Sequence, residues 1–238
     1  MAKRGSLKKF AIEEAKERPI RFRNYKYLFL IVCEDQRTEP EYFEKYVSQI
    51  PKETIYLEAI GIGRDPKGVV DKAIEERDAL ALRAKREVDV VWVVFDKDDA
   101  DENATKIERF ESAFNTAKEQ KIEIAYSNEV FELWLLLHFM NVDKETPLPR
   151  NNIYQLLQEQ FQRIPKYKNY IYDHSNPDSK TIEIIFESGN QDSAIKRAEL
   201  LFEHHKNHNP IEANPSTKVY VLVKELLEWI RYFSYKPE

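Results

Sequence analysis

Two short runs of apolar residues, each ending in acids, are the clearest pattern along the chain. One run spans Tyr27 to Cys33 and is followed by Glu34, and the other spans Val90 to Phe95 and is followed by Asp96 and Asp98. Nearly continuous apolar, β-branched runs of this length are typical of strands buried on both faces of a parallel sheet. Ligands bind at the carboxyl ends of such strands, so we expect the three acids to converge on one edge of the sheet.

The rest of the pattern alternates between strand and helix. Two more strands are predicted, at residues 55–62 and 122–127, with helical segments between the strands. The resulting βαβαβαβ order predicts an α/β protein with a mainly parallel four-stranded sheet and helices on both of its faces. The predicted helices are Phe10 to Arg18, a helix that Thr38 opens, and residues 68–86, 103–121, 128–139, 153–161, 192–206 and 216 onward.

Cap residues predict where three of these helices begin. Thr38 with Glu41 matches a capping box, in which each side chain hydrogen bonds to the backbone of the other residue. Asn151 or Asn152 can cap the helix that covers residues 153–161, and Ser216 can cap the last helix.

Composition divides the chain into three parts. Residues 1–26 hold nine Lys and Arg against three Glu, although the whole chain has a net charge of −5. Such a basic arm on an acidic body either contacts phosphates through non-specific electrostatics or serves as a solubilising tail, and both interpretations stay open. A Pro-rich connector after residue 140 separates an α/β domain, residues 27–140, from a helical C-terminal region, residues 141–238, that we expect to pack on it.

Composition also favours a cytoplasmic protein. The chain has 238 residues, of which 42% are hydrophobic and 33% are charged. No apolar run approaches the roughly 20 residues of a membrane span, and no signal peptide is visible. The single cysteine, Cys33, excludes a disulfide within the chain, which fits a reducing compartment.

Acids gathered at one sheet edge need a cation between them. Three carboxylates held close together repel one another, and hard oxygen ligands of this kind suit Mg²⁺ or Mn²⁺. We therefore expect Glu34, Asp96 and Asp98 to bind the metal and to act in catalysis. The simpler alternative is that acids after strands are loop residues or helix caps.

Two more glutamates are candidates for the same site. Glu39 stands in the first turn of a predicted helix, where it is either a further metal ligand or a favourable charge against the helix dipole. Glu132 opens a segment that is apolar nearly all round, and a charge in such a setting is normally paired or bound to metal. We interpret Glu132 as a fourth catalytic residue, and its alternative is again a charge at a helix N-terminus.

The second half offers cations and rings for a nucleic acid. In the stretch RIPKYKNYIYDHSNPDSK, basic residues alternate with tyrosines. Cations for phosphates and rings for base stacking suit a single-stranded or flexible nucleic acid, although a surface loop anchored by its tyrosines gives the same pattern. Arg64 and Lys67, after the second strand, can also meet a phosphate. The predicted substrate-binding residues are Arg37, Lys166, Tyr167, Lys168 and Ser216.

The histidines suggest little chemistry. His138 lies in the apolar segment and is more often a satisfied buried histidine than a ligand. His204, His205 and His208 resemble a zinc site only in outline, because their spacing puts at most two of them on one helical face and no cysteine accompanies them.

Five stretches carry a resemblance to a known family. They are FLIVCED, RTEPEYF, VVFDKDDAD, SNEVFELWLLLHF and NPSTKVYVLVKEL, and they occur in this order between Tyr27 and Leu227. Together they resemble the RloB family, whose members carry a Toprim-like domain, the metal-dependent fold of topoisomerases, primases and OLD-type nucleases. The resemblance places a Tyr-x-Lys-like element near Lys168, which makes this the preferred phosphate-binding lysine. Such chains typically have Gly after the first glutamate, whereas this one has Asp35, which either alters the metal geometry or points to solvent.

The resemblance implies a function in prokaryotic anti-phage defence, commonly beside an ATPase partner protein. With the acids, it predicts a Mg²⁺-dependent nuclease that cuts RNA, tRNA among the candidates, or DNA. One alternative is a non-catalytic subunit of a defence ATPase complex that binds nucleic acid or a partner. A phosphotransferase or nucleotide-binding regulator is a weaker alternative, because no P-loop is present. The long last helix makes a homodimer plausible.

Overall fold

The computed structural model describes residues 22–175 and 179–235. Its centre is a four-stranded sheet in the order β2-β1-β3-β4, in which every neighbouring pair is parallel. The strands are β1 (Tyr27–Cys33), β2 (Ile55–Gly61), β3 (Val90–Asp96) and β4 (Glu123–Ser127). The α/β architecture and all four predicted strands are thus confirmed. The predicted helix from Phe10 to Arg18 and most of the basic arm lie outside the described residues.

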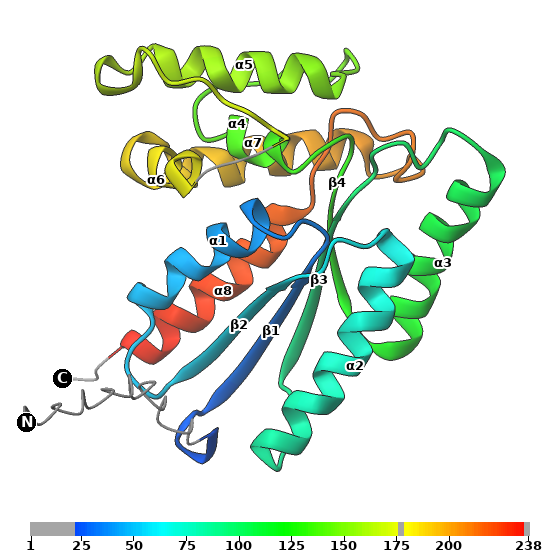
Figure 1. Cartoon of the computed structure of the whole chain (residues 1–238), viewed down its shortest axis with the longest axis vertical. Helices are drawn as coiled ribbons and strands as arrows, with labels where there is room; N and C mark the ends of the chain where they lie inside the picture. The colour runs from blue at the N-terminus through cyan, green and yellow to red at the C-terminus, as the bar shows by residue number, and fades with distance from the viewer. Residues whose placement is uncertain (1–21, 176–178, 236–238) are drawn as a thin grey trace, which may run out of the picture.

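Helices surround the sheet on both faces and beyond its carboxyl end (Figure 1). Their bounds are α1 (Thr38–Glu44), α2 (Pro66–Ala84), α3 (Ala104–Gln120), α4 (Glu132–Leu136), α5 (Arg150–Gln162), α6 (Ser179–Ser188), α7 (Gln191–His205) and α8 (Val219–Ser234). Three 3₁₀ segments complete the described elements: η1 (Phe22–Asn24), η2 (Lys45–Gln49) and η3 (Pro165–Tyr167). Helix α6 was not predicted, and α4 is much shorter than the predicted helix over residues 128–139.

The central strand β1 is buried on both faces because its apolar side chains alternate between two cores. Phe29, Ile31 and Cys33 join the core beneath α1 and α8, whereas Leu30 and Val32 join the core beneath α2 and α3. Alternate residues of a strand point to opposite faces, which is why a continuous apolar run suits this position. The larger core also takes in α4 to α7, so the C-terminal helices share their apolar contacts with one face of the sheet.

Three helix starts differ from the predicted caps. Helix α1 follows Arg37, and the carboxylate of Asp35 accepts the amides of Gln36 (2.7 Å), Arg37 (3.2 Å) and Thr38 (2.5 Å), so no capping box forms there. The carboxylate of Asp35 therefore serves as the acceptor for the amides at and just before the start of α1. Whether Asp35 also alters the geometry of a metal site stays a prediction.

The other two corrections concern α5 and α8. Pro149 precedes α5, so Asn151 and Asn152 lie inside the first helical turn instead of capping it. Helix α8 follows Lys218, and the Thr217 hydroxyl, not Ser216, lies within 3.3 Å of the Val219 amide.

Across residues 22–175 and 179–235, every helix is too short or too polar to span a bilayer.

Candidate functional site

Glu34 and Asp96 are joined across the ends of two adjacent strands. The register of β1 against β3 places Cys33 beside Val94, and the Glu34 amide donates to the Val94 carbonyl at 2.9 Å. The Asp96 amide in turn donates to the Glu34 carboxylate at 2.8 Å. The predicted convergence of these acids is therefore present. We call Glu34, Asp96 and Asp98 the acid rim, because all three line one cavity of about 220 Å³ at the carboxyl end of the sheet.

Glycines at the end of β2 and just after it let the chain pack against the loop that carries Glu34. A Cβ added at Gly61 would lie 2.3 Å from the Asp35 carbonyl oxygen, so a larger residue would push the loop away. Gly63 has a φ of 61° and its amide donates to the Glu34 carbonyl at 2.8 Å. These contacts fix the main chain on both sides of the Glu34 side chain.

Asp96 and Glu39 each keep one buried carboxylate oxygen without a partner. Asp96 Oδ2 accepts the Phe131 amide at 2.9 Å and Glu39 Oε2 accepts the Asp35 amide at 3.1 Å. Asp96 Oδ1 and Glu39 Oε1 are buried and have no hydrogen-bond partner in the part of the chain that the structure describes. Both residues line a second cavity, of about 140 Å³. Carboxylate oxygens that lack a donor are costly to bury and are the kind of atom that a cation satisfies.

Burial and mutual repulsion oppose ionisation of these acids. Desolvation raises the pKa of Glu34 to about 8, with the nearby Asp98 adding to the effect. Desolvation, assisted by the charges of the neighbouring carboxylates, also raises the pKa of Asp96 and that of Glu39 well above their ordinary values. The site is therefore electrostatically prepared for a positive charge.

Glu132 belongs to the same cavity. It lies at the start of α4, is 9% exposed and lines the cavity with Glu39, Asp96 and Asp98. The Tyr172 hydroxyl donates to its Oε1, and burial raises the pKa of its carboxyl. Glu132 is thus paired, as a charge in an apolar setting should be, and it reaches the site through the buried position of α4.

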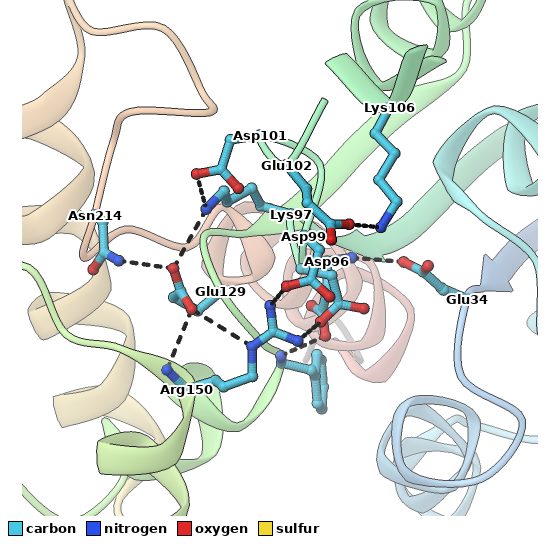
Figure 2. Close-up of polar contacts among 12 residues, drawn as sticks. Glu34, Asp96, Lys97, Asp99, Asp101, Glu102, Lys106, Glu129, Arg150 and Asn214 are labelled. Carbon is cyan, nitrogen blue, oxygen red and sulfur yellow. Dashed lines mark hydrogen bonds and ion pairs between the residues drawn. The ribbon is translucent and has the colours of Figure 1, made fainter. Parts of the chain in front are cut away.

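Arg150 is a component of the site that sequence reasoning missed. Its guanidinium lies 3.1 Å from Asp98, 2.6 Å from Asp99 and 3.7 Å from Glu129 (Figure 2). Arg150 is the first residue of α5, so it ties the C-terminal helices to the loop after β3. Desolvation raises the pKa of Asp98, whereas the Arg150 charge lowers it. The carboxylate of Asp98 is therefore partly neutralised from within the chain.

A buried lysine pairs with two acids next to the loop that follows β3. Lys97 is 6% exposed, and its Nζ lies 2.8 Å from Asp101 and 3.4 Å from Glu129 (Figure 2). Asn214 also donates to Glu129, at 3.2 Å. Glu129 therefore links Lys97, Arg150 and the segment before α8 into one network.

The main chain at this network is strained. Asp98 has a φ of 45° and Glu129 a φ of 71°, a region that non-glycine residues rarely adopt. The Asp98 amide donates to the Glu129 carbonyl at 3.0 Å, so a main-chain hydrogen bond joins the two residues that have positive φ. Strain of this kind costs about 1–3 kcal/mol per residue and clusters at functional sites.

Basic side chains border the acid rim, but they are not the predicted lysines. Lys106 and Arg109 line the cavity of about 220 Å³, and Arg37 and Arg64 line an adjoining open cavity of about 620 Å³ that also reaches Glu34. Of the predicted substrate-binding residues, Arg37 alone lines any of these three cavities.

The other four predicted substrate contacts lie elsewhere. The ring of Tyr167 is 4% exposed and its hydroxyl donates to Glu187, so it cannot stack on a base. Ser216 is fully buried and cannot reach a substrate. Lys166 pairs with Glu187 at 2.6 Å and Lys168 follows it on the exterior, outside the cavities of the acid rim. The alternation of rings and cations reflects the anchoring of a surface segment.

Asp96 of the acid rim and the neighbouring Glu39 fit a divalent cation in donor chemistry. Two buried carboxylate oxygens, Asp96 Oδ1 and Glu39 Oε1, line one cavity and lack a partner among the described residues. Among residues 22–175 and 179–235, no three His, Cys, Asp or Glu side chains are arranged as a preformed metal cage. Mg²⁺ commonly keeps several waters and takes only one or two carboxylates, together with substrate phosphate oxygens.

His138 is a buried, satisfied histidine, as predicted. Its Nδ1 lies 3.0 Å from the Trp134 carbonyl oxygen and its Nε2 lies 3.4 Å from the Tyr42 hydroxyl. Because a carbonyl oxygen can only accept, Nδ1 carries the proton of the neutral ring. Burial lowers the pKa of His138 to about 4.

Comparison with known proteins gives one match. A family model described as RloB-like protein matches residues 29–226, which is most of the chain. No curated protein and no solved structure matches it.

Proposed function

The chain belongs to the RloB-like protein family, and from that premise we propose that it is a Mg²⁺- or Mn²⁺-dependent nuclease that cleaves RNA or DNA. The resemblance of its motifs to Toprim-type enzymes supports this activity, as does the acid-rich end of its parallel sheet. We further propose that it acts in the cytoplasm in prokaryotic anti-phage defence, beside an ATPase partner.

One observation carries the proposal. The Glu34 carboxylate accepts the Asp96 amide at 2.8 Å, which brings the acids of two strands together beside the unpartnered oxygens of Asp96 and Glu39. A structural protein gains nothing from burying such oxygens, because each costs roughly 1–3 kcal/mol when unsatisfied. A site that binds a cation during its activity accounts for them.

Asp96 and Glu39 are the residues that would hold the metal most directly, with Glu34 and Asp98 at its edge. A bound Mg²⁺ would polarise a phosphate and stabilise the charge that develops during cleavage. Glu34, whose pKa burial raises to about 8, can hold a proton near neutral pH and so serve as a general acid or base.

The cations beside the rim would position the substrate. Arg150 presents a planar guanidinium next to Asp98, and guanidinium groups bind phosphate through two parallel hydrogen bonds. Arg64 and Arg109 border the adjoining cavities and suit the neighbouring phosphates of a strand. Phosphate binding thus falls to cations from several elements around the rim.

The test is cleavage by purified protein with and without Mn²⁺. Mixed tRNA, single-stranded RNA and DNA, and duplex DNA are each incubated with wild type, Glu34→Gln, Asp96→Asn and Asp71→Asn. Asp71 is a matched control, because it is an exposed acid of α2 paired with Lys67. The proposal predicts Mn²⁺-dependent cleavage that Glu34→Gln and Asp96→Asn abolish and Asp71→Asn preserves. Equal activity in all four proteins would refute it.

A non-catalytic binding subunit is the second candidate. Arg150 and Lys97 already neutralise Asp98, Asp99 and Asp101 within the chain, so that part of the loop is stable without a metal. A subunit of this kind would bind nucleic acid or its partner and cleave nothing under any metal condition in the same assay.

A further inference from the structure

The rings of Tyr154 and His174 form a stacked pair at the edge of the site. Their centroids lie 4.4 Å apart and their planes differ by 10°. Tyr154 is half-buried on α5, whereas His174 is exposed in the segment that follows η3. An aromatic ring supported on one face by a fixed neighbour presents a flat surface at low entropic cost.

His174 stands between two of the cavities that contain the acids. It lines the cavity of about 620 Å³ with Glu34, Arg37 and Arg64, and it lines the cavity of about 140 Å³ with Asp96. Tyr154 lines the cavity of about 140 Å³ as well, together with Glu132 and Asp96. Burial and the charges of these two acids raise the pKa of its hydroxyl. The stacked pair therefore borders the place where a phosphate would be cleaved.

The His174 imidazole has no structural task that accounts for its position. Among residues 22–175 and 179–235 it makes no hydrogen bond and no ion pair, and its one ring contact is Tyr154. The tyrosines that the sequence offered for stacking are engaged instead, since Tyr167 and Tyr172 are buried and hydrogen bonded to carboxylates.

The adjoining cavity has the size and polarity of a nucleotide site. Its volume of about 620 Å³ falls within the range of roughly 300–1,000 Å³ that ligand sites occupy. Arg37 and Arg64 line it together with His174, so the cavity has cations as well as a ring. Aromatic rings and backbone-binding cations are the two elements of single-strand recognition.

We propose that the Tyr154–His174 pair is a base-stacking platform that holds one unpaired nucleotide beside the scissile phosphate. The inference rests on the proposed nuclease function and names its substrate class as single-stranded nucleic acid. A base inside a duplex already stacks on both faces and does not reach a protein ring unless it leaves the helix. The platform therefore selects single strands, loops or unpaired ends.

The experiment measures binding separately from cleavage. Fluorescence anisotropy follows a fluorescein-labelled 12-nucleotide single-stranded RNA, the DNA strand of the same sequence and the corresponding DNA duplex, with Ca²⁺ in place of Mg²⁺. The proteins are wild type, His174→Ala, His174→Trp and the control His208→Ala, which removes an exposed histidine of the His205–His208 pair. Thermal unfolding of each variant verifies that it is folded.

The platform predicts that His174→Ala weakens single-strand binding about 5- to 150-fold, the range expected for the loss of one stacked base. His174→Trp should restore affinity to within about threefold, because indole also stacks, and duplex binding should be unchanged in both variants. His208→Ala should bind like wild type.

Three results would overturn the platform: unchanged binding by His174→Ala, equal losses in His174→Ala and His174→Trp, or equal losses for single strand and duplex. Absence of single-strand binding by the wild-type protein would overturn it as well. The proposed nuclease function is judged apart from these results, by Mn²⁺-dependent cleavage and its loss in Asp96→Asn. Cleavage that survives His174→Ala with unchanged affinity would leave the nuclease standing and remove the platform.

Discussion

The amide of Asp96 donates a 2.8 Å hydrogen bond to the carboxylate of Glu34, which joins the ends of β3 and β1. This bond places the Glu34 side chain, just after β1, against the main chain of β3, so Glu34 and Asp96 cannot move apart without breaking it. Asp96 Oδ1 stays buried without a partner in the described part of the chain. The predictions below follow from this arrangement and from the residues that surround it.

Arg150 should affect substrate binding more than folding. We expect Arg150→Gln to raise KM for a cleaved single strand by about tenfold, because a charge-assisted hydrogen bond contributes roughly 1.5–3 kcal/mol. Arg150→Lys keeps the charge but loses the planar guanidinium, so its KM should lie between that of wild type and that of Arg150→Gln. Steady-state kinetics measures both. Loss of kcat with an unchanged KM in Arg150→Gln would show that the guanidinium does not serve in binding.

Lys97 should be a strong determinant of stability. Its side chain is 7% exposed and pairs with Asp101 and Glu129. Asp101 is half exposed and Glu129 keeps other partners, so Lys97→Met should lower the free energy of unfolding by about 1–3 kcal/mol, the cost of leaving a buried polar group unsatisfied. Urea denaturation measures the change. Lys72→Met is the control, because Lys72 pairs on the exterior of α2 and its loss should leave the stability nearly unchanged.

Asp35 should matter through the amides that it accepts at and just before the start of α1. Its carboxylate accepts the amides of Gln36, Arg37 and Thr38. We expect Asp35→Gly to lower the free energy of unfolding by about 0.5–2 kcal/mol, whereas Asp35→Asn keeps an acceptor and costs less. Mn²⁺ affinity should change less than about threefold in Asp35→Gly, because the native carboxylate is already engaged. A much larger loss of affinity, measured by calorimetry, would show that Asp35 is a ligand.

His138 should make the protein less stable in mild acid. Burial lowers the pKa of His138 from 6.5 to about 4, so between these values the unfolded chain binds the proton and the folded chain does not. The free energy of unfolding contributed by this residue is therefore complete above pH 6.5 and decreases as the pH falls toward 4, by at most about 3 kcal/mol.

His138→Phe isolates this effect from that of the acids. The acid rim has raised pKa values and therefore acts in the opposite direction as the pH falls. Urea denaturation at several pH values between 4 and 8 should show a wild-type curve that drops more steeply toward acid than the curve of His138→Phe. Parallel curves for the two proteins would contradict the assignment.

The sheet and the acid rim were predictable because their signals are local. Continuous apolar runs identify strands buried on both faces, and parallel strands bring their carboxyl ends to one edge. Once β1 and β3 are neighbours, Glu34 and Asp96 must lie close together. Glu132 was accessible by a similar argument, since a carboxylate within an apolar segment needs a partner.

The basic half of the site depends on tertiary contacts that no local pattern encodes. Arg150 follows a Pro-rich connector and lies 51 residues after Asp99 in the chain. The two residues meet only because α5 packs over the carboxyl end of the sheet. His174 follows tyrosines that look equally suited to stacking in the sequence. Only the structure shows that Tyr167 and Tyr172 are buried whereas His174 is exposed. Helix α6 begins just after a run of Asn, Pro and Asp, whose turn chemistry obscured it.

The most direct test of the metal site is calorimetric titration of Mn²⁺ into wild type and Asp96→Asn. The substituted amide keeps an oxygen that accepts the Phe131 amide, so the fold should be retained while the charge at the site is lost. The account predicts acid-dependent Mn²⁺ binding by wild type and an affinity at least about tenfold weaker in Asp96→Asn. Equal Mn²⁺ affinity in the two proteins would contradict it.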